Sequence, residues 1–124
     1  MSTFLLAAVA ATAFNLSCDL HMKMVVSHDA EPIEADIRKT LRVDLATMQW
    51  CENECTETEP IERVNTTVLT LVEEADRRID SYKSLTINRE SGRLDYHMRI
   101  NESSVDEKGF CKPTPFTGFP ARKF

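Results

Sequence analysis

The chain has 124 residues, of which 42% are hydrophobic, and a formal net charge of −5 at pH 7. This length provides for one domain, and the hydrophobic content suffices for a small core, which excludes a chain disordered throughout. Acidic residues outnumber basic ones, and the basic ones are dispersed, so we expect no nucleic-acid partner.

The first thirteen residues have the pattern of a secretory signal peptide. Residues 4–13 form an uncharged apolar run, and Ala11 and Ala13 supply small side chains at positions −3 and −1 of a cleavage site. The run is too short to cross a bilayer, which takes roughly 20 residues, so we expect no membrane span. The pattern predicts a signal peptide over 1–13 and a secreted chain starting at Phe14. Because no Lys or Arg precedes the run, a buried N-terminal element of a cytosolic protein is the alternative.

Four cysteines follow the predicted leader: Cys18, Cys51, Cys55 and Cys111. An even number in a small secreted chain predicts two disulfides, for which three pairings exist. We favour the two pairings that join Cys18 and Cys111 separately to the Cys51–Cys55 pair, because both close long loops. The third pairing, with a short Cys51–Cys55 loop, stays open. The Cys-x₃-Cys spacing and the scattered histidines argue against a zinc site.

Three sequons add to the secretory pattern, at Asn15, Asn65 and Asn101. Asn15 lies almost at the predicted mature terminus, so glycosylation is expected at Asn65 and Asn101.

The residue pattern before the cysteine pair predicts a strand and then a helix. Apolar residues alternate with others from Leu20 to Val26, as in a half-buried strand. From Ile33 to Met48 they recur in steps of three and four, which predicts an amphipathic helix. The same residues also alternate in part, so a strand competes there.

The stretch from Ile61 to Tyr82 supports two interpretations. Its apolar residues recur in helical steps, which predicts one long helix. However, Val64–Val72 is rich in β-branched residues, so a strand followed by a helix over 73–83 is nearly as well supported.

A hairpin, a polar loop and an irregular tail are predicted for the rest of the chain. Residues 85–87 and 94–100 alternate as two strands around a polar turn in which Gly92 can adopt a positive φ. A polar loop is expected over 101–109. The fold class predicted is therefore α+β: one small domain over 14–111, with an antiparallel sheet packed against one or two amphipathic helices and stapled by disulfides. Residues 112–124 are expected to form an extended tail rich in Pro and Phe.

The sequence contains no catalytic signature. It has three glycines, no phosphate-binding loop and no nucleophile elbow, so we expect neither an enzyme nor a cofactor. The leading hypothesis is a secreted, disulfide-bonded glycoprotein that binds another extracellular or membrane protein, as an inhibitor or accessory subunit. Phe116, Phe119 and Phe124 of the tail are its candidate contact residues. The oligomeric state is left open.

The alternative hypothesis is an extracellular carrier of a small apolar ligand. Its cavity would lie between the sheet and the helices, and four methionines could line it: Met22, Met24, Met48 and Met98.

Overall fold

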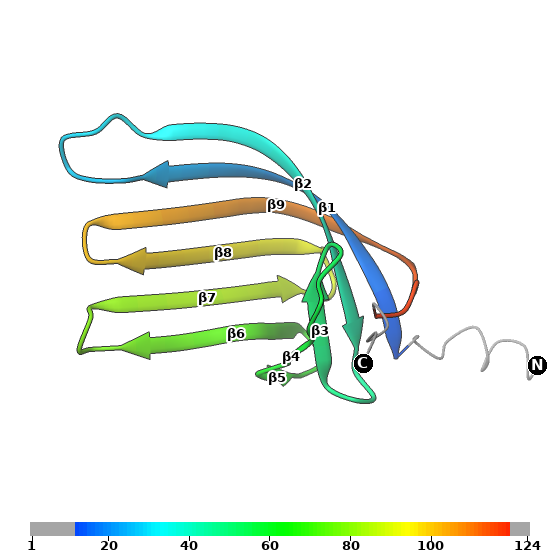
Figure 1. Cartoon of the computed structure of the whole chain (residues 1–124). Coiled ribbons are helices and arrows are strands. Elements are labelled where there is room, and N and C mark those ends of the chain that lie inside the picture. The colour runs from blue at the N-terminus through cyan, green and yellow to red at the C-terminus, as the bar shows by residue number, and fades with distance from the viewer. Residues whose placement is uncertain (1–11, 120–124) are drawn as a thin grey trace, which may run out of the picture.

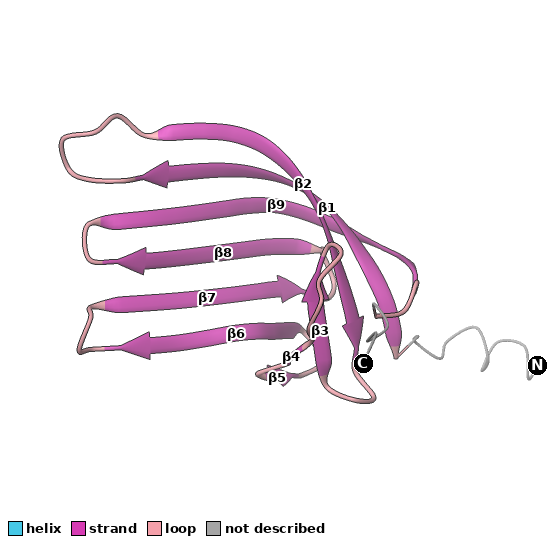
Figure 2. Ribbon diagram, in the orientation of Figure 1, coloured by secondary structure: helices cyan, strands magenta, loops and turns pink. Residues whose placement is uncertain are grey.

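The computed structural model describes residues 12–119, and all its regular elements are β-strands (Figures 1 and 2). The strands are β1 (Ala13–Val25), β2 (Ile33–Asp44), β3 (Gln49–Glu52), β4 (Glu59–Pro60), β5 (Arg63–Val64), β6 (Val68–Asp76), β7 (Ser81–Asn88), β8 (Arg93–Ile100) and β9 (Ser103–Pro115). They form one antiparallel sheet in the order β4-β3-β2-β1-β9-β8-β7-β6-β5. No helix long and apolar enough to cross a membrane occurs within residues 12–119.

The predicted α+β class is therefore wrong, because both expected helices are strands. The segment expected as a helix from Ile33 is β2, and its whole length pairs with β1, so its alternating pattern decides its structure. The segment from Ile61 contains β5 and β6, and four of its β-branched residues, Val64, Val68, Thr70 and Val72, belong to these strands. The expected helix over 73–83 is instead the hairpin between β6 and β7.

Of the elements predicted after residue 84, the hairpin is confirmed and the polar loop is not. The hairpin is confirmed as β7 and β8, and Gly92 has a φ of 79° in its turn. The expected polar loop over 101–109 is wrong, because most of it belongs to β9, which pairs with both β1 and β8.

The sheet curls so that its two edges approach each other at one end. β4 and β5 are the opposite edges of the sheet, yet they are consecutive in the chain and separated only by Ile61 and Glu62. Figure 1 shows β3, β4 and β5 crossing one end of the sheet, while the hairpin ends of β1, β2, β9, β8, β7 and β6 extend away from them.

The core lies on the inner face of this curl. Its buried side chains are Leu16, Cys18, Leu20, Leu41, Val43, Trp50, Ile61, Leu69, Leu71, Val72, Leu85, Ile87, Leu94 and Cys111. Cross-strand partners such as Leu16 and Leu41 point to the same face, so the register fixes which residues are inside. Leu71 and Val72 are both buried although consecutive, because an irregularity in the pairing of β6 with β7 falls between Thr70 and Val72.

Candidate binding surfaces

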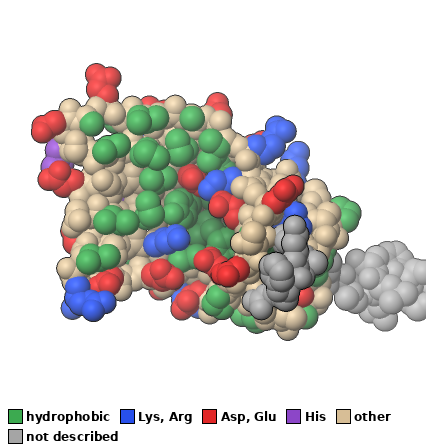
Figure 3. All heavy atoms as spheres, in the orientation of Figure 1, with side chains coloured by type: hydrophobic (Ala, Val, Ile, Leu, Met, Phe, Trp, Pro, Cys, Tyr) green, Lys and Arg blue, Asp and Glu red, His purple; other side chains and the backbone are tan. Residues whose placement is uncertain are grey.

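The inner face of the sheet continues beyond the core as an uncovered apolar surface, which we call the apolar shelf. The register places its members on one face, because Met24 pairs with Ile33 on one side and with Val105 on the other, and Val105 pairs with Met98. The shelf comprises Met22, Met24, Ile33, Ile37, Met98, Ile100 and Val105. Figure 3 shows hydrophobic side chains gathered over this part of the molecule. Ile33 is 53% exposed and Ile100 is 43% exposed, while the other five members are partly buried, so the shelf is most open at Ile33 and Ile100.

The outer face of the same strands is polar and carries paired charges. Arg38 on β2 contacts Asp19 on β1 at 2.8 Å, and His97 on β8 contacts Asp106 on β9 at 2.7 Å. His21 lies 2.8 Å from Glu34, and its Nδ1 is also within hydrogen-bonding distance of Asp36. The outer face is thus largely ionic, although Phe110 and Tyr82 are also exposed on it, and the inner face is largely apolar.

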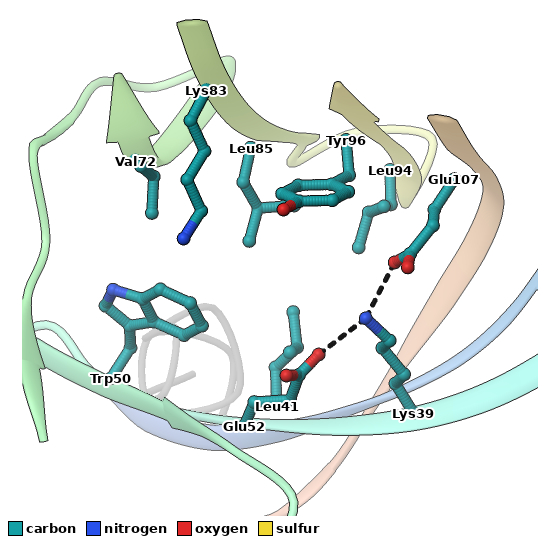
Figure 4. Close-up of a pocket in the computed structure, with 10 residues that line it drawn as sticks. All are labelled: Lys39, Leu41, Trp50, Glu52, Val72, Lys83, Leu85, Leu94, Tyr96 and Glu107. Atoms are coloured by element: carbon teal, nitrogen blue, oxygen red, sulfur yellow. Dashed lines mark ion pairs between the residues drawn. The ribbon is translucent and has the colours of Figure 1, made fainter. Parts of the chain in front are cut away.

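A small polar pocket lies where the shelf meets the core, and we call it the lysine pocket. Lys39 Nζ is 2.7 Å from both Glu107 Oε1 and Glu52 Oε1, and these two carboxylates come from β9 and β3 (Figure 4). Glu107 is only 6% exposed, and the contact with Lys39 offsets the cost of burying its carboxylate. The Lys39 ammonium also lies 5.7 Å from the centre of the Tyr96 ring.

Burial and charge shift the pKa values of two groups in the lysine pocket. Burial is the largest influence on Lys39 and lowers its pKa, but hydrogen bonds to Glu107 and Glu52 outweigh it, so the net pKa is raised above 10.5. Burial raises the pKa of Tyr96 above 10.0, so its hydroxyl stays protonated and can donate a hydrogen bond.

Two further donors of the lysine pocket have no protein partner among residues 12–119. The buried indole Nε1 of Trp50 has no hydrogen-bond acceptor. The Lys83 ammonium extends from β7 into the space above the Trp50 ring, and no described carboxylate forms an ion pair with it (Figure 4). These donors suit a ligand or partner group that accepts hydrogen bonds.

A second pocket, which we call the mouth pocket, has a volume of about 440 Å³. Its charged lining residues are Arg89, Lys112 and Glu90, and its apolar lining includes Phe14, Leu16, Leu69, Ile87 and Pro113. The lysine pocket is much smaller, at about 90 Å³. Pockets for drug-sized ligands measure roughly 300–1,000 Å³, so of these two pockets only the mouth pocket has the volume for such a molecule.

Two disulfides are present, as predicted, but the two pairings that we favoured are wrong. Cys18 bonds Cys111, and Cys51 bonds Cys55. The register explains the first bond, because Cys18 on β1 and Cys111 on β9 lie directly opposite each other with Cα atoms 4.0 Å apart. This pairing was the one left open by the sequence.

The sequons differ in their local structure. Asn101 is exposed in the turn between β8 and β9, and its φ is 53°. Asn65 is also exposed, but its Oδ1 accepts hydrogen bonds from the N–H groups of Thr67 and Val68. Asn15 is buried, and its side-chain amide donates to Thr117 Oγ1. Glycosylation of Asn65 and Asn101 stays a prediction.

The predicted contact residues of the tail lie against the domain where the structure describes them. β9 extends to Pro115, and Phe116 and Phe119 then pack edge to face with ring centres 5.3 Å apart. Arg42 Nη1 donates a hydrogen bond to the carbonyl oxygen of Gly118, which holds this segment to β2. Phe124 lies outside the described residues.

The lysine pocket was missed by the sequence reasoning, although one signal could have indicated it. Lys39 interrupts the inner-face alternation of Ile37 and Leu41, and a cation at such a position requires a buried partner. Glu107, which supplies that partner, is far away in the sequence. Three of the four methionines proposed as ligand-lining do share the shelf, whereas Met48 packs against the core.

No protein-family model matches the chain, and no curated protein or solved structure is significantly similar to it.

Proposed function

We propose that this chain is a secreted, disulfide-bonded protein-binding module that holds an amphipathic segment of a partner polypeptide on its apolar shelf. The observation that carries the proposal is the contrast between the two faces of the sheet. Large apolar side chains such as Ile33 stay exposed on the inner face, while the outer face has its charges paired. Uncovered apolar patches of this kind mark interaction sites.

The composition of the shelf favours a polypeptide as its occupant. Methionine side chains adapt to irregular apolar surfaces, and Met22, Met24 and Met98 contribute three of them. The shelf ends at the lysine pocket, where Lys83 can pair with a carboxylate of the partner. The expected segment therefore has apolar side chains toward the shelf and an acidic residue near Lys83.

The edges of the sheet favour the same kind of occupant. β3 pairs with β2 only from Leu41 to Asp44, and β5 pairs with β6 only at Leu69 and Thr70. Beyond Thr70, the β6 side of the sheet ends in a strand edge with no described neighbour, and a polypeptide can pair with its main-chain groups whereas an apolar small molecule cannot.

The extracellular setting is supported by the leader pattern and by the two disulfides, which are compatible with an oxidising compartment. β1 begins at Ala13, so cleavage after this residue would leave Phe14 as the first residue of the strand. Mass spectrometry of the natural protein before and after deglycosylation and reduction tests this setting. We expect a chain starting at Phe14, glycans on Asn65 and Asn101, and a mass gain of four hydrogen atoms when the two disulfides are reduced. A chain that keeps its leader and has free thiols would contradict it.

The binding proposal is tested with a variant of the shelf and a matched variant of the outer face. Met24→Glu combined with Met98→Glu places charge on the shelf, and Phe110→Glu changes an apolar side chain that is 58% exposed on the opposite face. Each tagged full-length chain is expressed in its natural host, and the secreted material is analysed by native mass spectrometry.

We expect the wild type and Phe110→Glu to carry the same partner polypeptide in fixed stoichiometry, and the shelf variant to lose it with an unchanged circular dichroism spectrum. In the wild-type complex, Met24 and Met98 should resist peroxide oxidation. Retention of the partner by the shelf variant, or its loss from Phe110→Glu alone, would refute the proposal.

A second candidate function, the carrier of a small apolar ligand, is favoured by the mouth pocket. The cavity cannot lie between sheet and helices as first expected, because residues 12–119 contain no helix. The mouth pocket instead offers an apolar lining in which two basic residues, Arg89 and Lys112, outnumber the acidic Glu90, which suits a molecule with an apolar body and an anionic end.

Titration with anilinonaphthalene sulfonate, which has this chemistry, tests the carrier function. Phe14→Glu should weaken binding of the dye at least about tenfold, and the shelf variant should leave it unchanged. Equal binding by wild type and Phe14→Glu would exclude the mouth pocket as its site.

A further inference from the structure

The outer half of β2 is an unpaired strand edge. β3 covers β2 only from Leu41 to Asp44, so the segment from Ile33 to Thr40 has β1 on one side and no described strand on the other. Figure 1 shows this part of β2 at the margin of the sheet. An edge of this length is a template for another strand.

Asn53 shows which main-chain groups of β2 point outward. Its N–H donates to the Thr40 carbonyl oxygen at 2.6 Å, and its Oδ1 accepts from the Thr40 N–H at 3.0 Å. Thr40 therefore directs its main-chain groups away from β1, and so do the alternate residues Arg38, Asp36 and Glu34. Asn53 occupies the groups of Thr40 and ends the available edge there.

The charges along this edge fit a second copy of the same edge in one register. When Ile37 faces Ile37 of the second copy, each Asp36 lies opposite an Arg38. Shifting the pairing by two residues in one direction places Asp36 opposite Asp36, and a shift of four places Glu34 opposite Asp36. A shift in the other direction places Arg38 opposite Arg38. Only the register centred on Ile37 brings opposite charges together and leaves no like-charged pair.

We propose that two copies of this chain associate through antiparallel pairing of their β2 edges, with the twofold axis at Ile37. Asp36 and Arg38 form hydrogen-bonded pairs across the axis, and each pair exchanges two main-chain bonds, about four in all. The side chains have room for the new contacts, since Asp36 is 92% exposed and Arg38 is 78% exposed.

The same register keeps the apolar faces of the two copies on one side. In this register, odd-numbered residues of one copy lie opposite odd-numbered residues of the other. Ile37 therefore contacts Ile37 on the inner face, and the two apolar shelves become continuous. Association of this kind goes beyond the proposed function, because the partner test uses Met24 and Met98, which lie on other strands.

Charge exchange tests the association. Asp36→Arg places two positive charges opposite each other on both sides of the axis, and Asp36→Arg combined with Arg38→Asp restores opposite pairs in reversed order. We expect the wild type to dimerise reversibly in sedimentation equilibrium, the single variant to weaken association at least about tenfold, and the double variant to recover it. A wild type that stays monomeric up to about 1 mM, or a double variant no stronger than the single one, would overturn the proposal.

Cross-linking tests the register independently. Ile37→Cys puts two thiols next to each other at the axis, whereas Ala35→Cys puts them opposite Lys39 of the second copy. Under mild oxidation we expect a rapid covalent dimer only from Ile37→Cys. A faster dimer from Ala35→Cys would overturn the register, and no dimer from either variant would overturn the association. Thermal melting of both variants verifies that they are folded.

Discussion

The two disulfides should differ strongly in what they contribute to stability, because they close loops of very different length. Cys18 and Cys111 are separated by 93 residues, and Cys51 and Cys55 by 4. The loss of loop entropy in the unfolded chain corresponds to about 4.6 kcal/mol for the long loop and about 2 kcal/mol for the short one.

Each bond can be measured without truncating its own side chains. Cys51→Ala with Cys55→Ala leaves only the Cys18–Cys111 bond, and Cys18→Ala with Cys111→Ala leaves only the other bond. Urea unfolding of each variant is compared in its oxidised and reduced forms, so that the sequence is constant within each comparison. With an m-value of about 1.5 kcal/mol/M, reduction of the long-loop bond should lower the urea midpoint by about 3 M.

Reduction of the Cys51–Cys55 bond should lower the midpoint by less than half as much. Equal shifts of the urea midpoint, or a larger shift for the short loop, would refute the loop-entropy reasoning. The bonds would then stabilise the protein through the native structure and not through the unfolded chain. A variant that is unfolded when reduced would give a lower limit, which still orders the two bonds if the other variant stays folded.

Three further outcomes follow from the structure. Glu107→Gln should cost about 2–3 kcal/mol in urea unfolding, because it removes the buried negative charge that pairs with the Lys39 ammonium, whereas Glu52→Gln, at a more exposed site, should cost less than about 1 kcal/mol; equal costs would contradict this order. NMR titration should give a His21 pKa above 6.5, raised chiefly by the hydrogen bond to Glu34, and Glu34→Gln should lower it. The associated stabilisation is fully present below pH 6.5 and is lost as the pH rises through the raised value, so an unshifted pKa would exclude it. Gly109→Ala should destabilise by at least about 3 kcal/mol, because a Cβ there would lie 2.0 Å from the Asp19 carbonyl oxygen on β1, and a melting temperature near that of the wild type would contradict the close approach of β1 and β9.

The sequence predicted the strands whose ends carry recognisable turn residues. The turn after β7 contains Gly92, and the hairpin around it was identified correctly. Three other hairpins turn through residues with positive φ that are not glycine: Met48 after β2, Asp80 after β6 and Asn101 after β8. Because no glycine marks the turn at Asp80, the sequence shows no boundary between the two strands around it. Their apolar residues, taken together as one segment, also fit a helical period.

The remaining features, which the sequence did not predict, depend on strand pairing between segments that are distant in the sequence. The segment from Ile33 fits both a helix and a strand, and contact with β1 along its whole length selects the strand. The same principle fixes the disulfides, since Cys18 and Cys111 meet through the register of β1 and β9 rather than through any property of their spacing. The Lys39 and Glu107 contact also depends on two strands that are brought together only by the whole sheet.

The position of β1 beside β9 has a consequence for the order of folding. Apart from this pair, every neighbouring pair in the sheet joins strands that follow one another in the chain. Strands β1 to β4 and strands β5 to β9 are therefore two local meanders, each of which can zip up from its own turns. Docking of β1 on β9 requires the two halves to meet, so it should be the slow step of folding, and the Cys18–Cys111 bond should accelerate it by keeping the two strands together in the unfolded chain.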